Sequence, residues 1–372
     1  MSHRANEGVS HRVNGGVSDG CAAGRHVFTV DVEDWFQVEN LKQRVSRADW
    51  ESLPRRVVEN TEAILRILRE AGDTRATFFI LGWVAEREPE LVRRIAAAGH
   101  EVASHGYNHE LVYEQSEAAF RADVRASREL LQRLSGQAVV GYRAPSFSIT
   151  EAGLRILAEE GFVYDSSWFP AAAHDRYSRL DLSGAGVAAE DAVAVEGAGA
   201  VESAVAASGG GRETGGSVFR LANGLWELPL TTVEVAGRAL AWSGGGYFRL
   251  IPYPLYRWGF ARAARQRGAA RQRETARQGG AALRDAGSCV FYLHPWEVDA
   301  GQPRVRGLRP GYRFRHYVGL ARTAGRLERL VRDFAFCTAR ELLEAAGGVS
   351  GADEPAADAG ASGDDVRGED RG

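Results

Sequence analysis

The chain has 372 residues, of which 44% are hydrophobic and 26% charged, and its formal net charge at pH 7 is −3. This composition is ordinary for a soluble protein, and the near-balanced charge argues against nucleic acid as the main partner. No apolar run approaches the length of a membrane span and the N-terminus has no hydrophobic signal core, so we expect a cytoplasmic protein without a transmembrane segment, unless a misplaced start codon hides an export signal. Its three cysteines are too widely spaced for a disulfide framework or a CxxC metal motif.

Three segments have compositions that favour disorder. Residues 1–24 are rich in Gly, Ser, Asn and Arg, and residues 347–372 are acidic and lack large apolar side chains. Residues 183–216 are rich in Ala, Gly, Val and Glu and show no periodicity. We therefore expect a disordered leader, a flexible insertion and a disordered acidic tail around one folded domain at residues 25–346.

Apolar strands alternate with amphipathic helices through that domain. The patterns predict strands at 26–32, 74–82, 101–104, 139–142, 162–164, 224–235 and 288–293, and helices at 54–71, 89–98, 116–134, 150–160, 254–284 and 318–333. A Gly-rich turn is expected at 244–250, and a strand, a turn and a helix at 336–346. Repeated β-α-β-α alternation with nearly continuous apolar strands predicts an α/β fold, either a barrel or an open parallel sheet.

Polar motifs follow the predicted strands directly. These are DVED at 31–34, HGYNH at 105–109, YRAPSF at 142–147, YDSS at 164–167 and HPWE at 294–297. In barrels and in open parallel sheets, the chemistry lies at the carboxyl ends of the strands. The sequence therefore predicts that these motifs meet at one rim.

The histidines of HGYNH have the spacing of a metal site. His105 and His109 are four positions apart, which places both imidazoles on one side of a helical turn. Two neutral imidazoles suit zinc or a similar divalent ion, but they do not fill its coordination shell. A carboxylate from elsewhere in the chain is expected to complete the site, with one position left for water.

Five motifs resemble those of a known family when they are taken in order. FTVDVEDWF, HGYNH, YRAPSF, YDSSWFP and FYLHPWE are similar to the motifs of the polysaccharide deacetylase family with the NodB-type homology domain. The resemblance covers about residues 26–346 without the insertion, and it is closest to a bacterial branch found with exosortase and exopolysaccharide gene clusters. It implies a distorted (β/α) barrel, usually with seven strands.

The resemblance also implies roles for single residues. Asp31 corresponds to the catalytic base, Arg143 to the residue that orients it, and His294 to the catalytic acid. His105 and His109 correspond to the metal-binding pair.

The metal carboxylate is left open by the sequence. The family's first motif usually has two adjacent aspartates and a glycine, whereas this chain has Asp31, Glu33 and Asp34 without that glycine. Either Glu33 or Asp34 is the expected metal ligand.

The expected substrate contacts come from the remaining motifs and aromatic residues. They are Pro145, Asp165, Trp168, Tyr247 and Trp296. The resemblance implies a zinc-dependent N-deacetylase acting on an N-acetylated polysaccharide or a lipid-linked oligosaccharide in exopolysaccharide biosynthesis, with membrane association through the substrate. Two alternatives stay open: a C–N hydrolase acting on a small amide, and a non-catalytic glycan-binding scaffold.

Overall fold

A computed structural model describes residues 25–170, 180, 218–277 and 287–347. Three segments were expected to be disordered: the leader, the insertion at 183–216 and the tail. They lie outside the described residues, apart from residue 347. Among the residues that are described, no helix is both long and apolar enough to cross a membrane.

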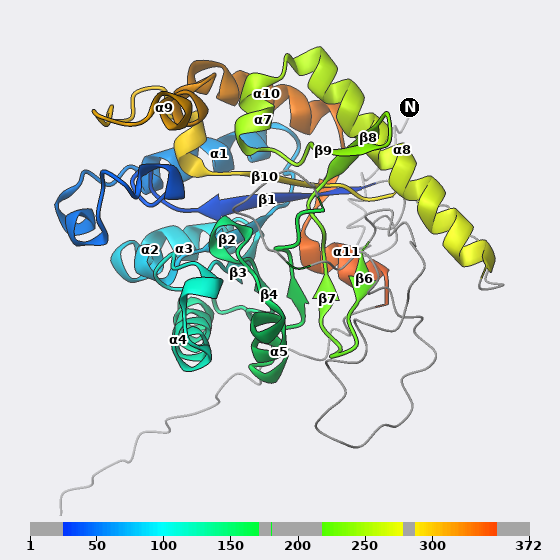
Figure 1. The fold of residues 1–372 in the computed structure, drawn as a ribbon, viewed down its shortest axis with the longest axis horizontal. Helices are drawn as coiled ribbons and strands as arrows, with labels where there is room; N and C mark the ends of the chain where they lie inside the picture. Colours follow the sequence, from blue (N-terminus) through cyan, green and yellow to red (C-terminus); the bar gives the residue numbers. More distant parts are fainter. Residues whose placement is uncertain (1–24, 171–179, 181–217, 278–286, 348–372) are drawn as a thin grey trace, which may run out of the picture.

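A curled sheet forms the centre of the molecule (Figure 1). Its strand order is β10 (Val290–Leu293), β1 (His26–Val32), β2 (Thr77–Ile80), β3 (Glu101–Ser104), β4 (Gly141–Tyr142), β5 (Tyr164–Asp165), β7 (Trp226–Glu227) and β6 (Phe219–Arg220), and β11 (Phe336–Cys337) also pairs with β1. Neighbours from β10 to β7 are parallel, and β6 is antiparallel. This arrangement confirms the expected α/β class and the distorted barrel: seven parallel strands run from β10 to β7, and β11 pairs in parallel with β1 as an eighth.

Side chains alternate between the two faces of each strand and thereby build two cores. In β1, Val27 belongs to the cluster inside the barrel, whereas Phe28 and Val30 belong to the cluster between the sheet and the helices. In β2, Phe79 points inward and Phe78 outward in the same way. Burial on both faces explains why these strands read as continuous apolar runs.

The barrel closes between β7 and β10 through segments that contribute few regular pairs. Thr231 Oγ1 accepts a hydrogen bond from Val290 N at 2.8 Å and donates one to Val290 O at 2.9 Å. Gly244 forms a parallel bridge with Tyr292, and its φ is 146°. A Cβ at position 244 would lie 1.9 Å from Tyr292 O, so only glycine permits this approach.

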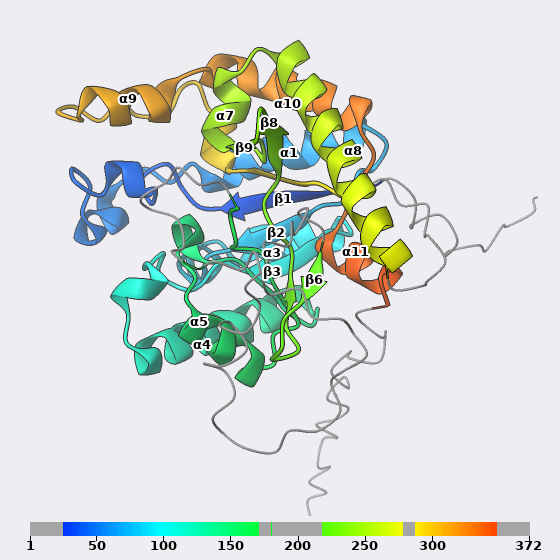
Figure 2. The ribbon, with the colours of Figure 1, turned by 45° about the vertical axis from the view of Figure 1, so that its right-hand side comes forward.

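Helices surround the sheet. They are α1 (Val57–Glu70), α2 (Gly82–Arg87), α3 (Pro89–Ala97), α4 (Glu117–Ser135), α5 (Glu151–Glu159), α7 (Gly245–Leu250), α8 (Tyr253–Arg277), α9 (Pro310–Tyr317), α10 (Leu320–Asp333) and α11 (Ala339–Ala345). The ends of α4 follow from its sequence, because Ser116 Oγ accepts the N–H of Ala119 and Gly136 stops the helix with a φ of 68°. Figure 2 shows α9 at the end toward which the arrow of β1 points.

Two predicted connections differ from the structure. Residues 244–250, expected to be a Gly-rich turn, form α7, and residues 310–317 form α9 ahead of the predicted helix at 318–333. A third helix, α2, follows β2 closely, between the strand predicted at 74–82 and the helix predicted at 89–98, where the sequence predicted no element. Long-range contacts of Arg249 with residues beyond 314 hold α7 and the end of α9 together, and local periodicity does not report such contacts. The two-stranded hairpin of β8 (Thr232–Val235) and β9 (Arg238–Ala241) precedes α7.

Candidate active site

The carboxyl ends of β1, β3 and β10 meet at one cavity of about 420 Å³. Its lining includes Asp31, Glu33, His105, His109 and His294. Glu33 and His294 are 261 positions apart in sequence, yet Glu33 Oε1 lies 3.4 Å from His294 Nε2. The rim predicted from the sequence is therefore present in the structure.

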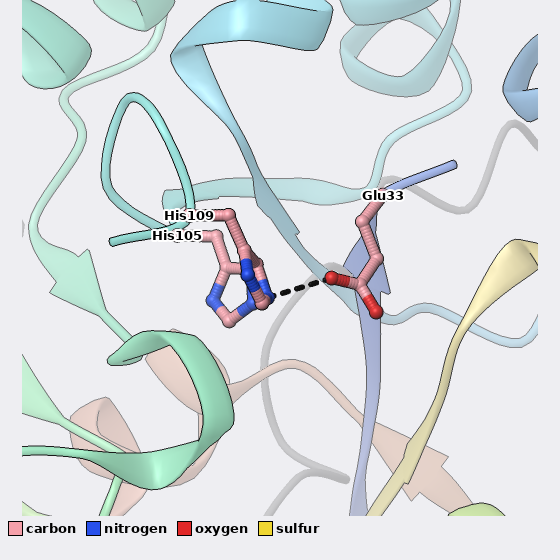
Figure 3. Close-up of side chains that lie close together, drawn as sticks. All are labelled: Glu33, His105 and His109. Atoms are coloured by element: carbon pink, nitrogen blue, oxygen red, sulfur yellow. Dashed lines mark ion pairs between the residues drawn. The ribbon is translucent and has the colours of Figure 1, made fainter. Parts of the chain in front are cut away.

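Three of these side chains form a cluster that suits a metal ion (Figure 3). Ligand atoms of Glu33, His105 and His109 all lie within 4.8 Å of one another, and His109 Nε2 is 2.8 Å from Glu33 Oε2. His105 Nδ1 lies 2.8 Å from the carbonyl oxygen of Arg143, so Nδ1–H donates to that oxygen and Nε2 is left for a ligand bond.

The chemistry of the cluster fits a divalent cation. Glu33 Oε2 is buried and accepts no aligned hydrogen bond, despite its closeness to His109. Burial by itself raises the pKa of Glu33, but His109, His294 and His105 outweigh it and lower that pKa to about 2. Burial lowers the pKa of His105 to about 4, which keeps its imidazole neutral. An ionised carboxylate and neutral imidazoles are the donors that zinc and similar ions prefer.

The loop that carries both histidines is held by Asp123 of α4. Asp123 Oδ2 accepts a hydrogen bond from Tyr107 N at 2.8 Å. Gly106 has a φ of 74°, and a Cβ there would lie 2.9 Å from Asp123 Oδ2. His109 itself has a φ of 55°, an uncommon conformation for a non-glycine residue. The contact with α4 thus fixes a strained loop whose two ends bear the imidazoles.

Asp34 lies apart from this cluster. Its Oδ2 accepts hydrogen bonds from the backbone N–H groups of Arg56 and Val57 at the start of α1, at 2.8 and 3.1 Å. Its Oδ1 accepts the N–H of Trp35 at 2.8 Å. Burial raises the pKa of Asp34 to about 6, although these donors oppose the rise. Of the two carboxylates left open by the sequence, the structure brings Glu33 to the histidines and Asp34 to a helix end.

Asp31 and Arg143 form a buried ion pair. Arg143 Nη1 donates to Asp31 Oδ1 at 2.7 Å and to Thr29 Oγ1 at 2.6 Å. The remaining guanidinium donors bind the carbonyl and hydroxyl oxygens of Ser166 at 2.9 and 2.8 Å, and the group lies over the ring of Phe79. Because Arg143 is fixed on all sides, it holds Asp31 in one orientation with Oδ2 facing the cavity.

His294 faces the cavity through Nε2 and is held from behind. Its Nδ1 lies 2.7 Å from Glu297 Oε1, and Glu297 Oε2 accepts from Arg249 Nε at 2.5 Å. Arg249 also donates to three carbonyl oxygens at the end of α9. The imidazole therefore donates Nδ1–H to a buried carboxylate that is itself neutralised by a buried guanidinium.

The charges around His294 favour its protonated form. Burial lowers the pKa of His294, but Glu33, Glu297 and Asp31 outweigh burial and raise the pKa to about 9. Its Nε2 lies 3.9 Å from Asp31 Oδ2. The proton donor His294 and the carboxylate of Asp31 therefore face the same space.

Two of the five residues predicted to contact substrate line the cavity. Tyr247 is half-buried there, and Trp296 is buried with its Nε1 3.3 Å from Glu33 Oε1. Trp296 also stacks between the imidazoles of His294 and His316, with ring centroids 5.3 and 4.5 Å away. Trp296 is thus placed to support His294 and Glu33, and only Tyr247 presents a partly exposed ring.

Pro145, Asp165 and Trp168 do not line this cavity. Asp165 is buried and accepts from the hydroxyl of Ser167 at 2.6 Å and from its backbone N–H at 3.0 Å. Trp168 N donates to Glu227 at 3.1 Å. The structure places Asp165 and Trp168 in a buried polar network beside the rim.

No role was predicted from the sequence for four residues that line the cavity on the side of His294, here called the acid side after its proton donor. They are Glu297, Arg249, Phe314 and Arg315. Glu297 left a signal, since a carboxylate three residues after a strand-end histidine can return to that histidine through a turn. Arg249 left none, because its partner is 48 positions away. Phe314 and Arg315 lie in a segment for which no element or role was predicted from the sequence.

Two family models match adjacent parts of the chain. The model described as polysaccharide deacetylase matches residues 48–164. A domain of unknown function, DUF3473, matches residues 166–271 and 275–344. The first match shows that residues 48–164, less than a third of the chain, are similar to polysaccharide deacetylases.

Curated proteins named as deacetylases are similar to this chain over a limited length. A peptidoglycan-N-acetylglucosamine deacetylase of Bacillus cereus is 36% identical over 106 residues, which are 28% of this chain and 38% of the relative. A chitin deacetylase of Colletotrichum lindemuthianum is 38% identical over 93 residues, 24% of this chain and 37% of that protein. The chain thus spans less than two fifths of either relative.

Solved structures show looser similarity. The Bc1960 peptidoglycan N-acetylglucosamine deacetylase aligns over 87% of this chain and 89% of its own, with 15% identity and a TM-score of 0.42. A family 4 carbohydrate esterase from Streptomyces lividans covers 40% and 64%, with 22% identity and a TM-score of 0.31. The family model and the curated relatives thus show similarity to polysaccharide deacetylases over part of this chain.

Proposed function

We propose that this protein is a metal-dependent hydrolase that removes acetyl groups from N-acetylated glycans. The observation that carries the proposal is the convergence of three functions in one cavity: the cluster of Glu33, His105 and His109, the carboxylate of Asp31, and the imidazole of His294. A C–N hydrolysis at neutral pH needs an activated water, a polarised carbonyl and a proton for the departing amine.

Glu33, His105 and His109 would hold the cation, and two imidazoles with one carboxylate favour zinc over magnesium or calcium. A zinc ion bound there would supply a Lewis acid for the acetyl carbonyl and lower the pKa of a bound water. Trp296 Nε1 and the backbone of Arg143 keep Glu33 and His105 in place for that purpose.

Asp31 serves as the base. It takes a proton from the attacking water as the water oxygen bonds to the acetyl carbon. Arg143 keeps Asp31 aimed at the cavity through a charge-assisted hydrogen bond to Oδ1.

His294 serves as the acid. Its Nε2 gives a proton to the amide nitrogen as the C–N bond breaks, which yields acetate and a free amino sugar. Glu297 accepts Nδ1–H and so fixes the tautomer and the plane of the imidazole.

The cavity favours a sugar polymer over a small enclosed amide. Leu250 and Phe314 line it and are 50% and 56% exposed, so it opens onto the surface. We propose exopolysaccharide biosynthesis as the setting, with a polysaccharide or a lipid-linked oligosaccharide as substrate; this part rests on the motif resemblance.

Acetate release from N-acetylglucosamine oligomers tests the proposal directly. Wild-type protein should release acetate, a chelator should stop the release, and zinc should restore it. Asp31→Asn keeps the shape of the side chain and should lower kcat by about 10²–10⁴-fold while zinc binding is retained. Full activity of Asp31→Asn would show that the base is misassigned, and no release from any N-acetylated glycan would remove the proposed activity.

A further inference from the structure

One wall of the cavity carries a positive charge, that of Arg315, which has no part in the proposed hydrolysis. Charged side chains of the lining include Asp31, Glu33, Glu39 and Glu297, and each lies near a cationic or histidine partner. Arg249, which also lines the cavity, is paired with Glu297. Arg315 is exposed and forms no ion pair with any carboxylate among the described residues.

Helix α9 directs this arginine into the cavity. The lining residues Gly311, Phe314, Arg315 and Val318 recur at i, i+3, i+4 and i+7, the spacing of one helix face. Phe314 is 56% exposed, so an aromatic ring and a guanidinium stand side by side on the open wall. Arg315 also lies close enough to Tyr247, on the α7 side, to lower the pKa of its hydroxyl against the larger effect of burial.

The surroundings of Arg315 are strongly positive. Residues 300–327 contain seven arginines and no aspartate or glutamate, although the chain as a whole has a net charge of −3. Four of them, Arg304, Arg306, Arg309 and Arg313, are exposed and have no carboxylate partner in the described part of the chain. By contrast, Arg121, Arg125 and Arg155 on the far helices all pair with glutamates.

We propose that the wall formed by Phe314 and Arg315 binds an anionic sugar residue next to the N-acetylated one. This inference rests on the proposed function, because it deepens the substrate class of the same cavity. Guanidinium binds carboxylate in a bidentate manner, and an aromatic ring offers a flat apolar surface for a pyranose. The unpaired arginines around the wall raise the local potential and attract an acidic polymer.

An anionic membrane is the other partner that such a wall could attract. The observations favour the glycan, because Arg315 and Phe314 line the same cavity as His294. Phe314 is also the single exposed large apolar residue on α9 within the described residues, and surface-bound helices bury a whole apolar face. Figures 1 and 2 place α9 at the rim end of β1, where a bound polymer would pass.

The test compares binding of two probes to the full chain without added metal, so that affinity is measured apart from turnover. The acidic probe is a hyaluronan hexasaccharide, which alternates glucuronate with N-acetylglucosamine, and the neutral probe is the N-acetylglucosamine hexamer. Wild-type protein should bind the acidic probe about tenfold more tightly, and added NaCl should reduce this preference. Arg315→Gln should lose most of the preference.

Arg313→Gln is the matched control. Arg313 is exposed and lies on the same helix, but two positions away, so it does not share the face of Arg315. It should change the preference by less than about twofold, since surface charges act weakly at a distance in salt. Equal affinities for the two probes in wild-type protein, or equal losses in both variants, would overturn the inference.

Two parallel measurements separate the possible failures. Acetate release from both probes reports the proposed function, and a preserved binding preference without acetate release would remove that function alone. Sedimentation with phosphatidylglycerol vesicles reports membrane binding. If Arg315→Gln weakens vesicle binding and leaves hyaluronan binding intact, the wall faces a membrane and the inference is wrong.

Discussion

The two sides of the cavity come from different halves of the chain and are built in different ways. The water-activating side, Asp31, Glu33, His105, His109 and Arg143, comes from β1 to β4 and the loops that follow them. The acid side comes from residues 249–318, within the DUF3473 match. The first is fixed by strand ends and backbone contacts, and the second by one buried ion pair that joins α7, η5 (Pro295–Val298) and α9.

This difference assigns water activation in the proposed hydrolysis to the first side and contacts with the rest of the substrate to the second. Strand ends have little freedom, so the water-activating side can recur unchanged with many substrates. The acid side is connected to the wall of the cavity through Arg249. This residue pairs with Glu297 behind His294, and it also donates to the carbonyl oxygens of Arg315 and Val318 at the end of α9. A change in α9 is therefore expected to alter the position of His294 together with substrate preference.

The largest expected effect belongs to the water-activating side. Glu33→Gln removes the one carboxylate that the structure brings to both histidines, and it should abolish stoichiometric zinc binding and lower kcat by about 10³-fold, since a Lewis acid is worth several kcal/mol. Asp34→Asn is the matched control and should keep zinc. Metal analysis of both purified variants decides the matter. Zinc retained by Glu33→Gln and lost by Asp34→Asn would reverse the assignment.

The next effect belongs to the acid side. Glu297→Gln preserves size but removes the charge that fixes His294, so kcat on N-acetylated oligomers should fall by about 10²-fold while zinc content stays unchanged. Hydrolysis of 4-nitrophenyl acetate should fall far less, because its leaving group needs no proton.

A second variant separates a folding defect of Glu297→Gln from a loss of proton donation. Glu297→Gln leaves Arg249 buried without a counter-charge, which can cost about 3–5 kcal/mol of stability. The double variant Glu297→Gln/Arg249→Met removes that unpaired charge and should show the same contrast between the two substrates. Equal losses on the amide and the ester in both variants would mean that Glu297 supports the fold and not proton donation.

The water-activating side was predictable from sequence to a greater extent than the acid side. Asp31 lies near the end of β1, His105 and Arg143 directly follow β3 and β4, and His109 is in the loop after β3, so period and position were enough to bring them to one rim. Glu33 and Asp34 could not be separated, because their difference depends on where α1 begins. Asp34 reaches the N–H groups of Arg56 and Val57, 22 and 23 positions later.

The acid side depends on contacts that leave no local pattern. Arg249 meets Glu297 and the end of α9 only after α7 and α9 have formed, and the sequence suggested a Gly-rich turn where α7 lies. Asp165 and Trp168 follow a strand as a substrate contact should, yet their hydrogen bonds lead into the buried network with Glu227. Position at a strand end predicts closeness to a rim and does not predict which way a side chain turns.

The smallest expected effects concern two buried histidines, one in each half. Burial lowers the pKa of His100 to about 4 and that of His316 to about 3, below the 6.5 expected for an unfolded chain. The folded state therefore resists a proton that the unfolded state accepts, so stability is complete above pH 6.5 and is lost as pH falls toward 4. The pKa of His100 is lowered by 2.5 and that of His316 by 3.5, which correspond to about 3 and about 5 kcal/mol of stability.

Variants of these histidines test whether the halves respond separately. His100→Asn keeps an acceptor for Ala76 N. Between pH 6.5 and 4, its free energy of unfolding in urea should fall by about 2–3 kcal/mol less than that of wild-type protein. Its acetate release should match wild type, since His100 lies between β2 and β3 and away from the cavity lining. His316→Asn should improve acid stability similarly but also lower kcat, because His316 stacks on Trp296 beside His294. If His100→Asn lowered kcat as much as His316→Asn, a change far from the cavity would affect catalysis as strongly as one beside His294, and the two halves would not respond separately.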